Sequence, residues 1–531
     1  MIEKPPSSFS RRQLLQWAAL AAAPQGLQLH RSAWAQARLG ADPFTLGVAS
    51  GSPTHDSVVL WTRLIGLPSG GAGAEVSVRW EVADDDQFSR TVQSGQTPAV
   101  AALAHSVHAE VTGLAPDRWY FYRFRVGEAV SPVGRTRTFA APGASAARLR
   151  LAYASCQRWE HGYYAAYRHM AQENLDAVLF LGDYIYEYPT AKGAVRTPPG
   201  GWVTSLDDYR QRYATHKQDP DLQAMHAASP WLVTWDDHEV QNDYAGLAAG
   251  NTGPDVASFA ARRASAYQAF YEHMPVRSAV LTRSVAGLAS GADMRIYSRT
   301  AHGQLASITL LDARQYKDPQ VCTSGGKAGS STVNPANCAA WADPARSLLG
   351  SAQERWLDSH WASTDGQASR WNLIGQQSLL GQRDWRVGPG QNLWNDGWDG
   401  YSAARTRLTD ALQKNAIRNA VVLGGDVHEN WVGQIKSDYA NPLSAAVGVE
   451  FCGTSITSRS GGNAKLAETL AENPHFVFAD AERKGYGVVD ITPQQITTTL
   501  RVVSDVTRQD AGIETLAQFT VASGRLEIER V

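Results

Sequence analysis

Two patterns of hydrophobic and polar positions divide the chain. Between residues 44 and 140, short apolar or alternating segments predict strands over 58–61, 76–80, 108–111 and 119–126. The sequence Val111-Thr112-Gly113-Leu114-Ala115-Pro116, followed by an aromatic-rich alternating segment, is typical of a corner in a fibronectin-like β-sandwich. We therefore expect an all-β N-terminal domain over residues 36–140, and Pro142 and Gly143 in the next segment predict a linker.

From about residue 147, apolar segments of strand length alternate with segments of helical length. Strands are predicted over 149–154, 177–181, 231–235, 305–311, 371–375 and 420–423. Helices are predicted over 162–173, 205–217, 254–273, 404–414 and 464–472, and residues 486–531 are strand-rich again. This alternation predicts an α/β domain over residues 147–531.

The first 35 residues have the three parts of an export signal in order. Ser10-Arg11-Arg12-Gln13-Leu14-Leu15 is a twin-arginine pattern, a short apolar run follows over 17–23, and Ala33-Trp34-Ala35 fits a cleavage site. The alternative is a frayed basic N-terminus on a cytoplasmic protein. No other stretch approaches the roughly 18 apolar residues of a membrane span, so we expect a soluble protein in the periplasm or outside the cell.

Composition and charge narrow the functional classes. The chain has 531 residues, of which 43% are hydrophobic, and this is enough for a sizeable core and excludes a wholly disordered chain. The 49 basic and 51 acidic residues give a formal net charge of -2. A near-neutral chain has no overall electrostatic footprint for nucleic acid, so we expect no specific nucleic-acid binding.

Export would permit disulfide bonds, and the four cysteines differ in their surroundings. Cys322 and Cys338 flank a segment rich in Gly and Ser, where a disulfide would contribute roughly 3 kcal/mol in the chain-entropy model. We predict this bond. Cys452 lies in a motif without partner ligands and is interpreted as a buried structural thiol, whereas Cys156 directly follows a predicted strand.

Polar residues that could bind metals follow four predicted strands directly. In open α/β sheets this edge is where ligands bind. The four segments are Ser155-Cys156-Gln157, Gly182-Asp183-Tyr184-Ile185-Tyr186, Asp236-Asp237-His238-Glu239 with Asn242 close behind, and Gly424-Gly425-Asp426-Val427-His428. Each segment alone has an ordinary interpretation: a buried free cysteine, a helix N-cap, a solvated charged turn, or a glycine-rich turn. Together they favour a metal site.

The donor types indicate two unlike metals. A thiol, a phenol and an imidazole at Cys156, Tyr186 and His428 favour iron, and the carboxylates around Asp237 and Asp426 favour a hard cation such as Ca2+ or Mg2+. Two metals roughly 3.5–4 Å apart are a recurrent clamp for phosphoryl transfer to water. No Gly-x-Ser-x-Gly elbow, Walker loop or Gly-x-Gly-x-x-Gly follows a strand, which argues against a serine hydrolase or a nucleotide-binding loop.

The ordered set of motifs resembles the PhoD-type alkaline phosphatases, within the calcineurin-like metallophosphoesterases related to purple acid phosphatases. The matching segments span nearly the whole mature chain: the four segments above, Phe44-Thr45-Leu46-Gly47-Val48-Ala49-Ser50-Gly51, Leu311-Asp312-Ala313-Arg314 and Trp398-Asp399-Gly400-Tyr401. The resemblance implies a catalytic core of two packed mixed sheets flanked by helices, preceded by a fibronectin-like β-sandwich. It also implies a secreted hydrolase of phosphate monoesters and diesters, exported by the twin-arginine machinery.

The resemblance further implies a site that holds Fe3+ and Ca2+. Carried over by motif, Cys156, Asp183, Tyr186 and His428 would bind iron, and Asp183 would bridge to calcium on Asp237 and Asp426. Substrate hydrolysis would proceed by attack of a metal-bound hydroxide, and His238 would protonate the leaving oxygen. Arg158, Arg314 and Asn242 are candidate substrate-binding residues, and the helix predicted over 464–472 could cover the site.

The sequence departs from the purple acid phosphatase pattern at two motifs. Asp-Asp-His-Glu stands where Gly-Asn-His-Glu is expected, and Gly-Asp-Val-His stands where Gly-His-x-His is expected, which adds anionic oxygen and favours a hard cation. Two alternative functions are a phospholipase-like phosphodiesterase acting on phospholipid or nucleotide-derived diesters and a non-catalytic secreted calcium-binding module. The second alternative leaves Cys156 and Tyr186 without a role.

Overall fold

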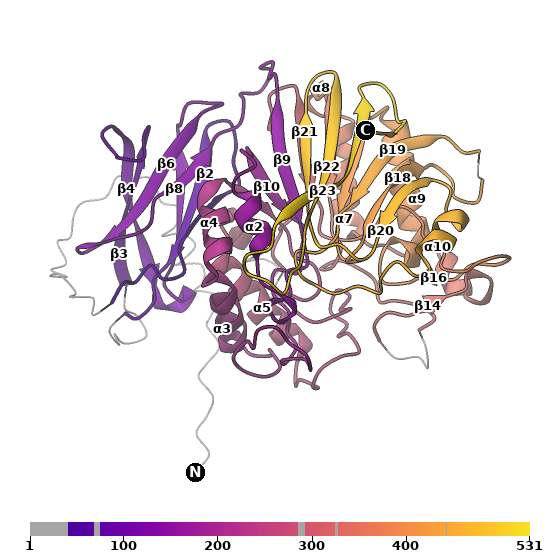
Figure 1. Ribbon diagram of the computed structural model, residues 1–531, viewed down its shortest axis with the longest axis horizontal. Coiled ribbons are helices and arrows are strands. Elements are labelled where there is room, and N and C mark those ends of the chain that lie inside the picture. The colour runs from indigo at the N-terminus through magenta and orange to yellow at the C-terminus, as the bar shows by residue number, and fades with distance from the viewer. Residues whose placement is uncertain (1–40, 68–74, 285–292, 324–327, 442) are drawn as a thin grey trace, which may run out of the picture.

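Two large β-sheets pack face to face, and helices cover their outer faces (Figure 1). The computed structural model describes residues 41–67, 75–284, 293–323, 328–441 and 443–531, so the predicted signal peptide lies outside the described residues. Between the sheets lies one apolar core that includes Leu151, Leu179, Leu373 and Val421. Together with the β-rich N-terminal part, this architecture confirms the predicted fold class.

The first large sheet has ten strands, and its parallel centre provides much of the candidate site. Its strands, in spatial order, are β24 (Glu529–Arg530), β23 (Ile513–Ala522), β22 (Gln495–Val503), β21 (Gly485–Ile491), β9 (Leu149–Ala154), β10 (Ala177–Phe180), β11 (Trp231–Val233), β1 (Val48–Gly51), β2 (Ser57–Arg63) and β5 (Ser106–Thr112). The strand-rich pattern after residue 486 therefore completes this sheet beside β9.

The second large sheet has seven strands, four of which run parallel at its centre. In spatial order they are β12 (Ser298–His302), β13 (Ala306–Leu310), β15 (Trp371–Gly375), β17 (Ala420–Gly424), β19 (Ala446–Cys452), β18 (Asn430–Lys436) and β20 (Phe476–Asp480). A small ladder joins β14 (Thr332–Val333) to β16 (Leu393–Trp394). The second sheet brings β17, with its polar C-terminal turn, close to the ends of β9 and β10.

The N-terminal part is a sandwich that shares one of its layers with the ten-stranded sheet. Its own sheet contains β4 (Thr91–Val100), β3 (Glu75–Ala83), β6 (Trp119–Val126), β7 (Ala129–Val130) and β8 (Gly134–Arg137). That sheet packs against β1, β2 and β5 through Val58, Val78 and Phe124. Strand β1 in turn runs parallel to β11, with Gly51 opposite Trp231. In Figure 1 the indigo N-terminal strands thus continue into the central strands.

Helices pack against the outer faces of both large sheets. They are α2 (Ala165–Met170), α3 (Leu206–Lys217), α4 (Pro220–Ala228), α5 (Phe259–His273), α6 (Ala279–Ser284), α7 (Gly350–Trp361), α8 (Thr364–Ala368), α9 (Ser402–Lys414) and α10 (Leu466–Glu472). Helix α4 was not predicted, although Asp219 caps it and Pro220 occupies its first turn. Helix α5 begins five residues later than predicted, because Ser258 caps it there.

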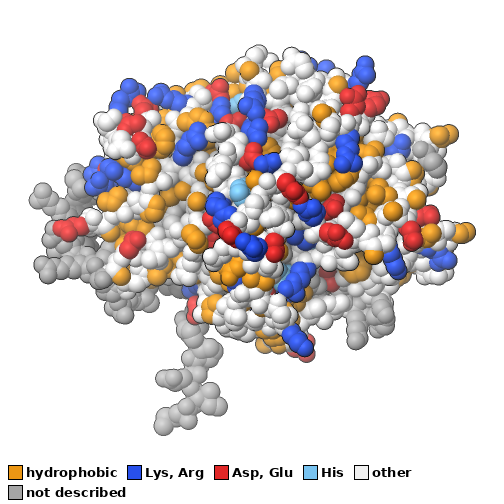
Figure 2. Space-filling view, in the orientation of Figure 1, with side chains coloured by type: hydrophobic (Ala, Val, Ile, Leu, Met, Phe, Trp, Pro, Cys, Tyr) orange, Lys and Arg blue, Asp and Glu red, His pale blue; other side chains and the backbone are white. Residues whose placement is uncertain are grey.

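The cysteines, the helices and the surface charge bear on the predicted environment of the protein. The structure has a disulfide bond between Cys322 and Cys338, and Cys452 is a buried free thiol. Among the described residues, no helix is both long enough and apolar enough to cross a bilayer. Acidic and basic side chains are mixed over the face shown in Figure 2.

Replacement of Leu179 by Ala tests the core between the sheets. Leu179 is fully buried there, so the L179A variant should lose about 2–5 kcal/mol of unfolding free energy from the lost contacts and the cavity. Denaturant unfolding would measure this loss. Val92→Ala is the control: Val92 is 43% exposed, and a change below about 0.5 kcal/mol is expected. Equal effects of the two substitutions would contradict the assigned core.

Candidate metal centre

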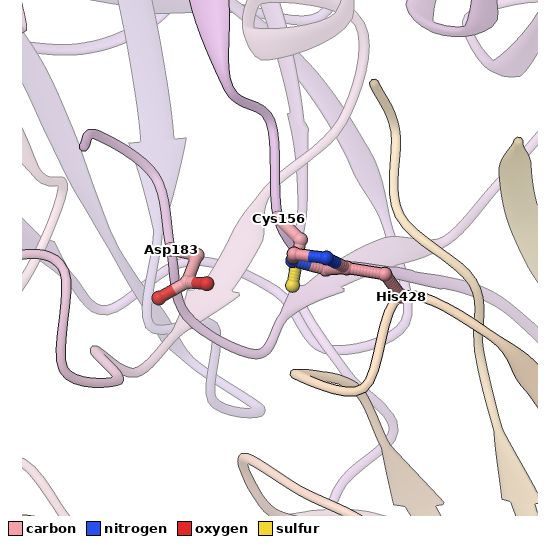
Figure 3. Close-up of side chains that lie close together, drawn as sticks. All are labelled: Cys156, Asp183 and His428. Carbon is pink, nitrogen blue, oxygen red and sulfur yellow. The ribbon is translucent and has the colours of Figure 1, made fainter. Parts of the chain in front are cut away.

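The candidate residues that follow the strands lie together at one end of the molecule's core, where the C-terminal ends of the parallel strands of both large sheets adjoin. Cys156 follows β9, Asp183 follows β10 and Asp237 follows β11, all in the ten-stranded sheet. Asp426 and His428 follow β17 of the seven-stranded sheet. Figure 3 shows the side chains of Cys156 and His428 beside each other and that of Asp183 to one side of them, on three separate turns. The site is therefore built from both sheets.

Two glycines allow these turns to approach one another closely. A Cβ atom on Gly182 would lie 2.4 Å from the Cβ of Asp236, and a Cβ on Gly425 would lie 2.3 Å from Oγ of Ser155. Both distances are too short for a side chain of any size. Glycine at these positions thus lets the turn after β10 contact the turn after β11, and lets the two sheets touch beside Cys156.

One cluster of donors combines sulfur, nitrogen and oxygen. The ligand atoms of Cys156, Asp183 and His428 all lie within 4.8 Å of one another, a spacing at which they could hold one metal ion. Tyr186 extends the cluster: its hydroxyl donates to Asp183 Oδ2 at 2.8 Å and lies 3.1 Å from Nε2 of His428. Ser458 contacts the same phenol oxygen at 2.8 Å.

The surroundings of His428 and Cys156 favour metal binding by both. His428 Nδ1 lies 2.8 Å from the carbonyl oxygen of Arg459, so Nδ1–H donates there and Nε2 presents its lone pair to the cluster. Burial lowers the pKa of His428 to about 3, which keeps this ring neutral. Burial and the charge of Asp183 raise the pKa of the Cys156 thiol. A cation would be needed to stabilise its thiolate.

The candidate ligands also have an uncommon backbone conformation. Cys156, Asp183, Asp426 and His428 have φ angles of 60°, 59°, 65° and 60°, in the left-handed region. Such conformations cost about 1–3 kcal/mol each outside glycine and cluster at functional sites. Three of these side chains, those of Cys156, Asp183 and His428, meet in the first cluster, whereas Asp426 is not one of its ligands.

A second cluster shares Asp183 with the first. Asp183, Asp237 and His238 offer ligand atoms within 4.8 Å of one another. Among the described residues, none donates a hydrogen bond to Oδ1 of Asp183 or to Oδ1 of Asp237, although both atoms are buried. Buried carboxylate oxygens without donors are costly unless a cation neutralises them. Burial and neighbouring carboxylates, Asp236 first among them, also raise the pKa of Asp426.

A third acidic group is already neutralised by the protein. Asp237, Asp243 and Asp396 lie close together, but Asp396 accepts from Arg314 at 2.6 Å and from Lys317 at 2.5 Å. Arg314 is 2% exposed and also pairs with Asp236. Although burial opposes it, Arg314 lowers the pKa of Asp237. Arg314 therefore holds the carboxylates in place, and this position leaves it little contact with an incoming substrate.

Glu239 fixes the two acidic turns relative to each other. Its buried carboxylate accepts hydrogen bonds from the backbone N–H groups of Asp183 at 3.1 Å, Tyr184 at 2.6 Å and Asp236 at 2.9 Å. Burial raises the pKa of Glu239 to about 7. Sequence reasoning noted this residue only as one acid of a run. The sequence signal for its contact with Asp236 was the spacing of three residues, the same spacing as in a capping box.

His238 is oriented by a residue that the sequence analysis missed. Nδ1 of His238 lies 2.7 Å from Oε2 of the fully buried Glu187, whose Oε1 accepts the backbone N–H of Asn242 at 2.9 Å. Burial opposes a charge on His238, but Glu187 raises its pKa well above the usual value. The ring of Tyr186 lies 4.1 Å from the imidazole. Nε2 of His238 is thus directed to the cluster side.

The remaining predicted residues lie around this site. The guanidinium of Arg158 pairs with Glu160 at 2.9 Å and lies over the rings of Tyr188 and Tyr186, at 4.8 and 5.5 Å. Its side chain retains 15% exposure, so it borders solvent beside the first cluster. Asn242 is half-buried near His238, and its side chain makes no hydrogen bond within the described part of the chain.

The fold and the clustered ligands define an α/β protein whose site can hold metal ions. Comparison with known proteins then identifies the family: a family model described as PhoD-like phosphatase matches residues 151–500, and one for the N-terminal domain of PhoD-like phosphatases matches residues 30–140. The chain belongs to the PhoD-like phosphatase family and is an enzyme of that family.

Two relatives match along most of the chain. Alkaline phosphatase D of Bacillus subtilis (strain 168) is 42% identical over 542 residues, covering 99% of this chain and 90% of the relative. A solved structure of PhoD superposes with a TM-score of 0.84 at 42% identity, covering 93% of this chain and 92% of that one. The predicted resemblance to PhoD-type phosphatases is confirmed.

Replacement of Glu239 by Gln tests whether this residue fixes the two acidic turns. An amide cannot accept three backbone N–H groups without directing its own N–H₂ at a donor, so Asp183 and Asp236 should shift. We expect hydrolysis of 4-nitrophenyl phosphate to fall about 10–100-fold, the usual cost of removing a partner of metal ligands.

Glu450→Gln is the matched control. Glu450 is also fully buried, has a pKa raised by burial to about 7, and accepts two backbone N–H groups, but it joins β19 to Leu380 and Gly381. Both variants should lose stability, and only E239Q should lose this much activity. Similar activities in the two variants would refute the assignment.

Proposed function

We propose that this protein is an exported alkaline phosphatase and phosphodiesterase that uses Fe3+ and Ca2+. Cys156, Asp183, Tyr186 and His428 would hold iron, and Asp183 would bridge to calcium on Asp237 and Asp426. The observation that carries the proposal is the pair of donor clusters that share Asp183, whose Oδ1 has no hydrogen-bond donor among the described residues. The similarity to alkaline phosphatase D of Bacillus subtilis supports the reaction class.

The donor chemistry of each cluster fits its proposed metal. Thiolate, phenolate and imidazole stabilise a transition metal such as iron, whereas the carboxylate oxygens of the second cluster suit calcium and leave His238 as a proton donor. When bound, the two metals would neutralise charge on the phosphate oxygens and lower the pKa of a water, so that hydroxide is available to attack phosphorus. The third acidic group is a weaker candidate for a metal site, because Arg314 and Lys317 already neutralise its Asp396.

The side chains that surround the metals would complete the reaction. The carboxylate of Glu187 holds His238 through Nδ1, so Nε2–H can protonate the leaving oxygen of the ester. The guanidinium of Arg158 borders solvent beside Tyr186 and would bind a phosphate oxygen of the substrate. Asn242 would add a neutral donor on the His238 side. Arg314 would keep Asp236 and Asp237 in position rather than bind substrate.

Two further observations support export to an oxidising compartment. The twin-arginine pattern in residues 1–35 suits a route that carries folded proteins, and a disulfide joins Cys322 to Cys338. The twin-arginine machinery would then be a transient partner. The substrates would be phosphate esters that reach this compartment. A preference for diesters such as phospholipid or nucleotide-derived esters would shift the assignment to a phospholipase-like phosphodiesterase, and parallel assays of a monoester and a diester distinguish the two.

Elemental analysis and visible absorption of the purified protein test the metal assignment. We expect iron and calcium, with a visible band from a phenolate bound to iron. Tyr186→Phe should abolish the band, because the phenol oxygen lies within the first cluster. Tyr188→Phe should keep it, because the Tyr188 ring packs beside His238 and under Arg158 and is not one of the proposed ligands. Zinc or manganese in place of iron, or a band that persists in Y186F, would overturn the assignment.

Replacement of His238 by Ala tests its role as a general acid. Loss of the proton donor should lower kcat about 10²–10⁴-fold while the bound metals remain. The loss should be largest for an alkyl phosphate, whose leaving group needs the proton, and smallest for 4-nitrophenyl phosphate. Glu187→Gln should show the same dependence on leaving group with a smaller loss, because it weakens only the orientation of His238. A loss that is equal for both leaving groups would exclude proton donation by His238.

A further inference from the structure

We propose that a second pocket, away from the metal centre, binds a small organic anion with an apolar or aromatic body. The pocket has a volume of about 380 Å³ and lies where the edge of the seven-stranded sheet meets β11 and the segment after β1. Its lining includes Thr54, Val233, Arg277, Tyr297 and Trp356. None of the residues that we place in the metal centre lines it.

The pocket carries positive charge and no acid of its own. Its lining includes Arg277, Arg295 and Arg299, and no lining residue is Asp or Glu. Arg277 is partly neutralised, since it lies 3.5 Å from a carboxylate oxygen of Glu110 and donates to Ser52 and Ser57. Arg299 donates only to the neutral hydroxyl of Ser307. Two guanidinium groups thus lack a carboxylate within ion-pair distance among the described residues.

Arg295 is the group that points most directly to a missing anion. Its Nε is buried and has no hydrogen-bond partner among the described residues. The guanidinium lies over the rings of Tyr297 and Trp356, at 4.5 and 5.5 Å from their centroids, which fixes its plane. The terminal guanidinium nitrogens of Arg295 also have no hydrogen-bond partner among the described residues and, unlike Nε, are reached by solvent. An oxyanion in the pocket beside Arg295 and Arg299 would bind them through charge-assisted hydrogen bonds.

The rest of the lining indicates that the anion has an apolar body. Leu232, Val233, Val276 and Leu310 are apolar, and Tyr297 and Trp356 add aromatic surface. His360 also lines the pocket, and burial lowers its pKa to about 4, so it contributes a neutral ring. Inorganic phosphate would leave this apolar surface wet. A ligand with one sulfonate, carboxylate or phosphate group on an apolar body would use both halves of the pocket.

Isothermal titration with 1-anilinonaphthalene-8-sulfonate tests the proposal on the intact, metal-loaded protein. Saturating inorganic phosphate is present to compete at the metal centre. We expect one dye per chain and a dissociation constant that rises about tenfold or more in Arg295→Gln/Arg299→Gln, through the loss of two charge-assisted bonds. Arg508→Gln is the control, since Arg508 is an exposed arginine paired with Asp510, and it should bind the dye as the unmodified protein does.

Two further measurements make the result decisive. The double variant should hydrolyse 4-nitrophenyl phosphate at the unmodified rate, which shows that it folds and that the metal centre is intact. N-phenyl-1-naphthylamine, which lacks the sulfonate, should bind more weakly than the sulfonate and equally to both forms. Equal affinity of the sulfonate for both forms, or no saturable binding in the presence of phosphate, would each overturn the proposal.

Discussion

The accumulation of buried carboxylates at one edge of the two sheets constrains the whole molecule. Asp183, Asp236 and Asp237 are only 1%, 1% and 3% exposed. Burial first, and then the neighbouring carboxylates, raise the pKa values of Asp183 and Asp236, and burying these charges opposes folding. The chain offsets part of this charge with Arg314, which pairs with Asp236. Backbone N–H groups stabilise Glu239. One oxygen each of Asp183, Asp236 and Asp237 still accepts no hydrogen bond among the described residues, and cations are proposed to bind at Asp183 and Asp237.

Bringing these groups together requires a backbone that regular strands do not supply. Cys156, Asp183 and His428 all leave their strands through left-handed conformations, and Gly182 and Gly425 remove the side chains that would keep the turns apart. The strain of about 1–3 kcal/mol per residue must be compensated by the surrounding structure. The apolar core between the sheets provides that support, since it anchors β9, β10 and β17 immediately before the turns.

The sequence predicted the parts of this structure that depend on local pattern. The strands over 119–126, 149–154 and 371–375 match β6, β9 and β15, because apolar periodicity determines them. Local pattern could not show that β1 joins β11 in the ten-stranded sheet. The sequence singled out Cys156, Asp183, Tyr186 and His428 because each follows a predicted strand, and the structure brings these four side chains together. Glu187 was missed, because its contact with His238 spans 51 residues and appears only in the folded chain.

The position of the site at the junction of both sheets links folding to metal binding. Asp183 comes from the ten-stranded sheet and His428 from the seven-stranded one, so the first cluster exists only after the sheets have packed. A ligand that binds only the folded state stabilises that state, and here it would stabilise the contact between the sheets in particular. The metal ions would then bind the folded chain in preference to the unfolded one. A twin-arginine route, which carries folded proteins, suits an enzyme whose cofactors and sheet packing depend on each other in this way.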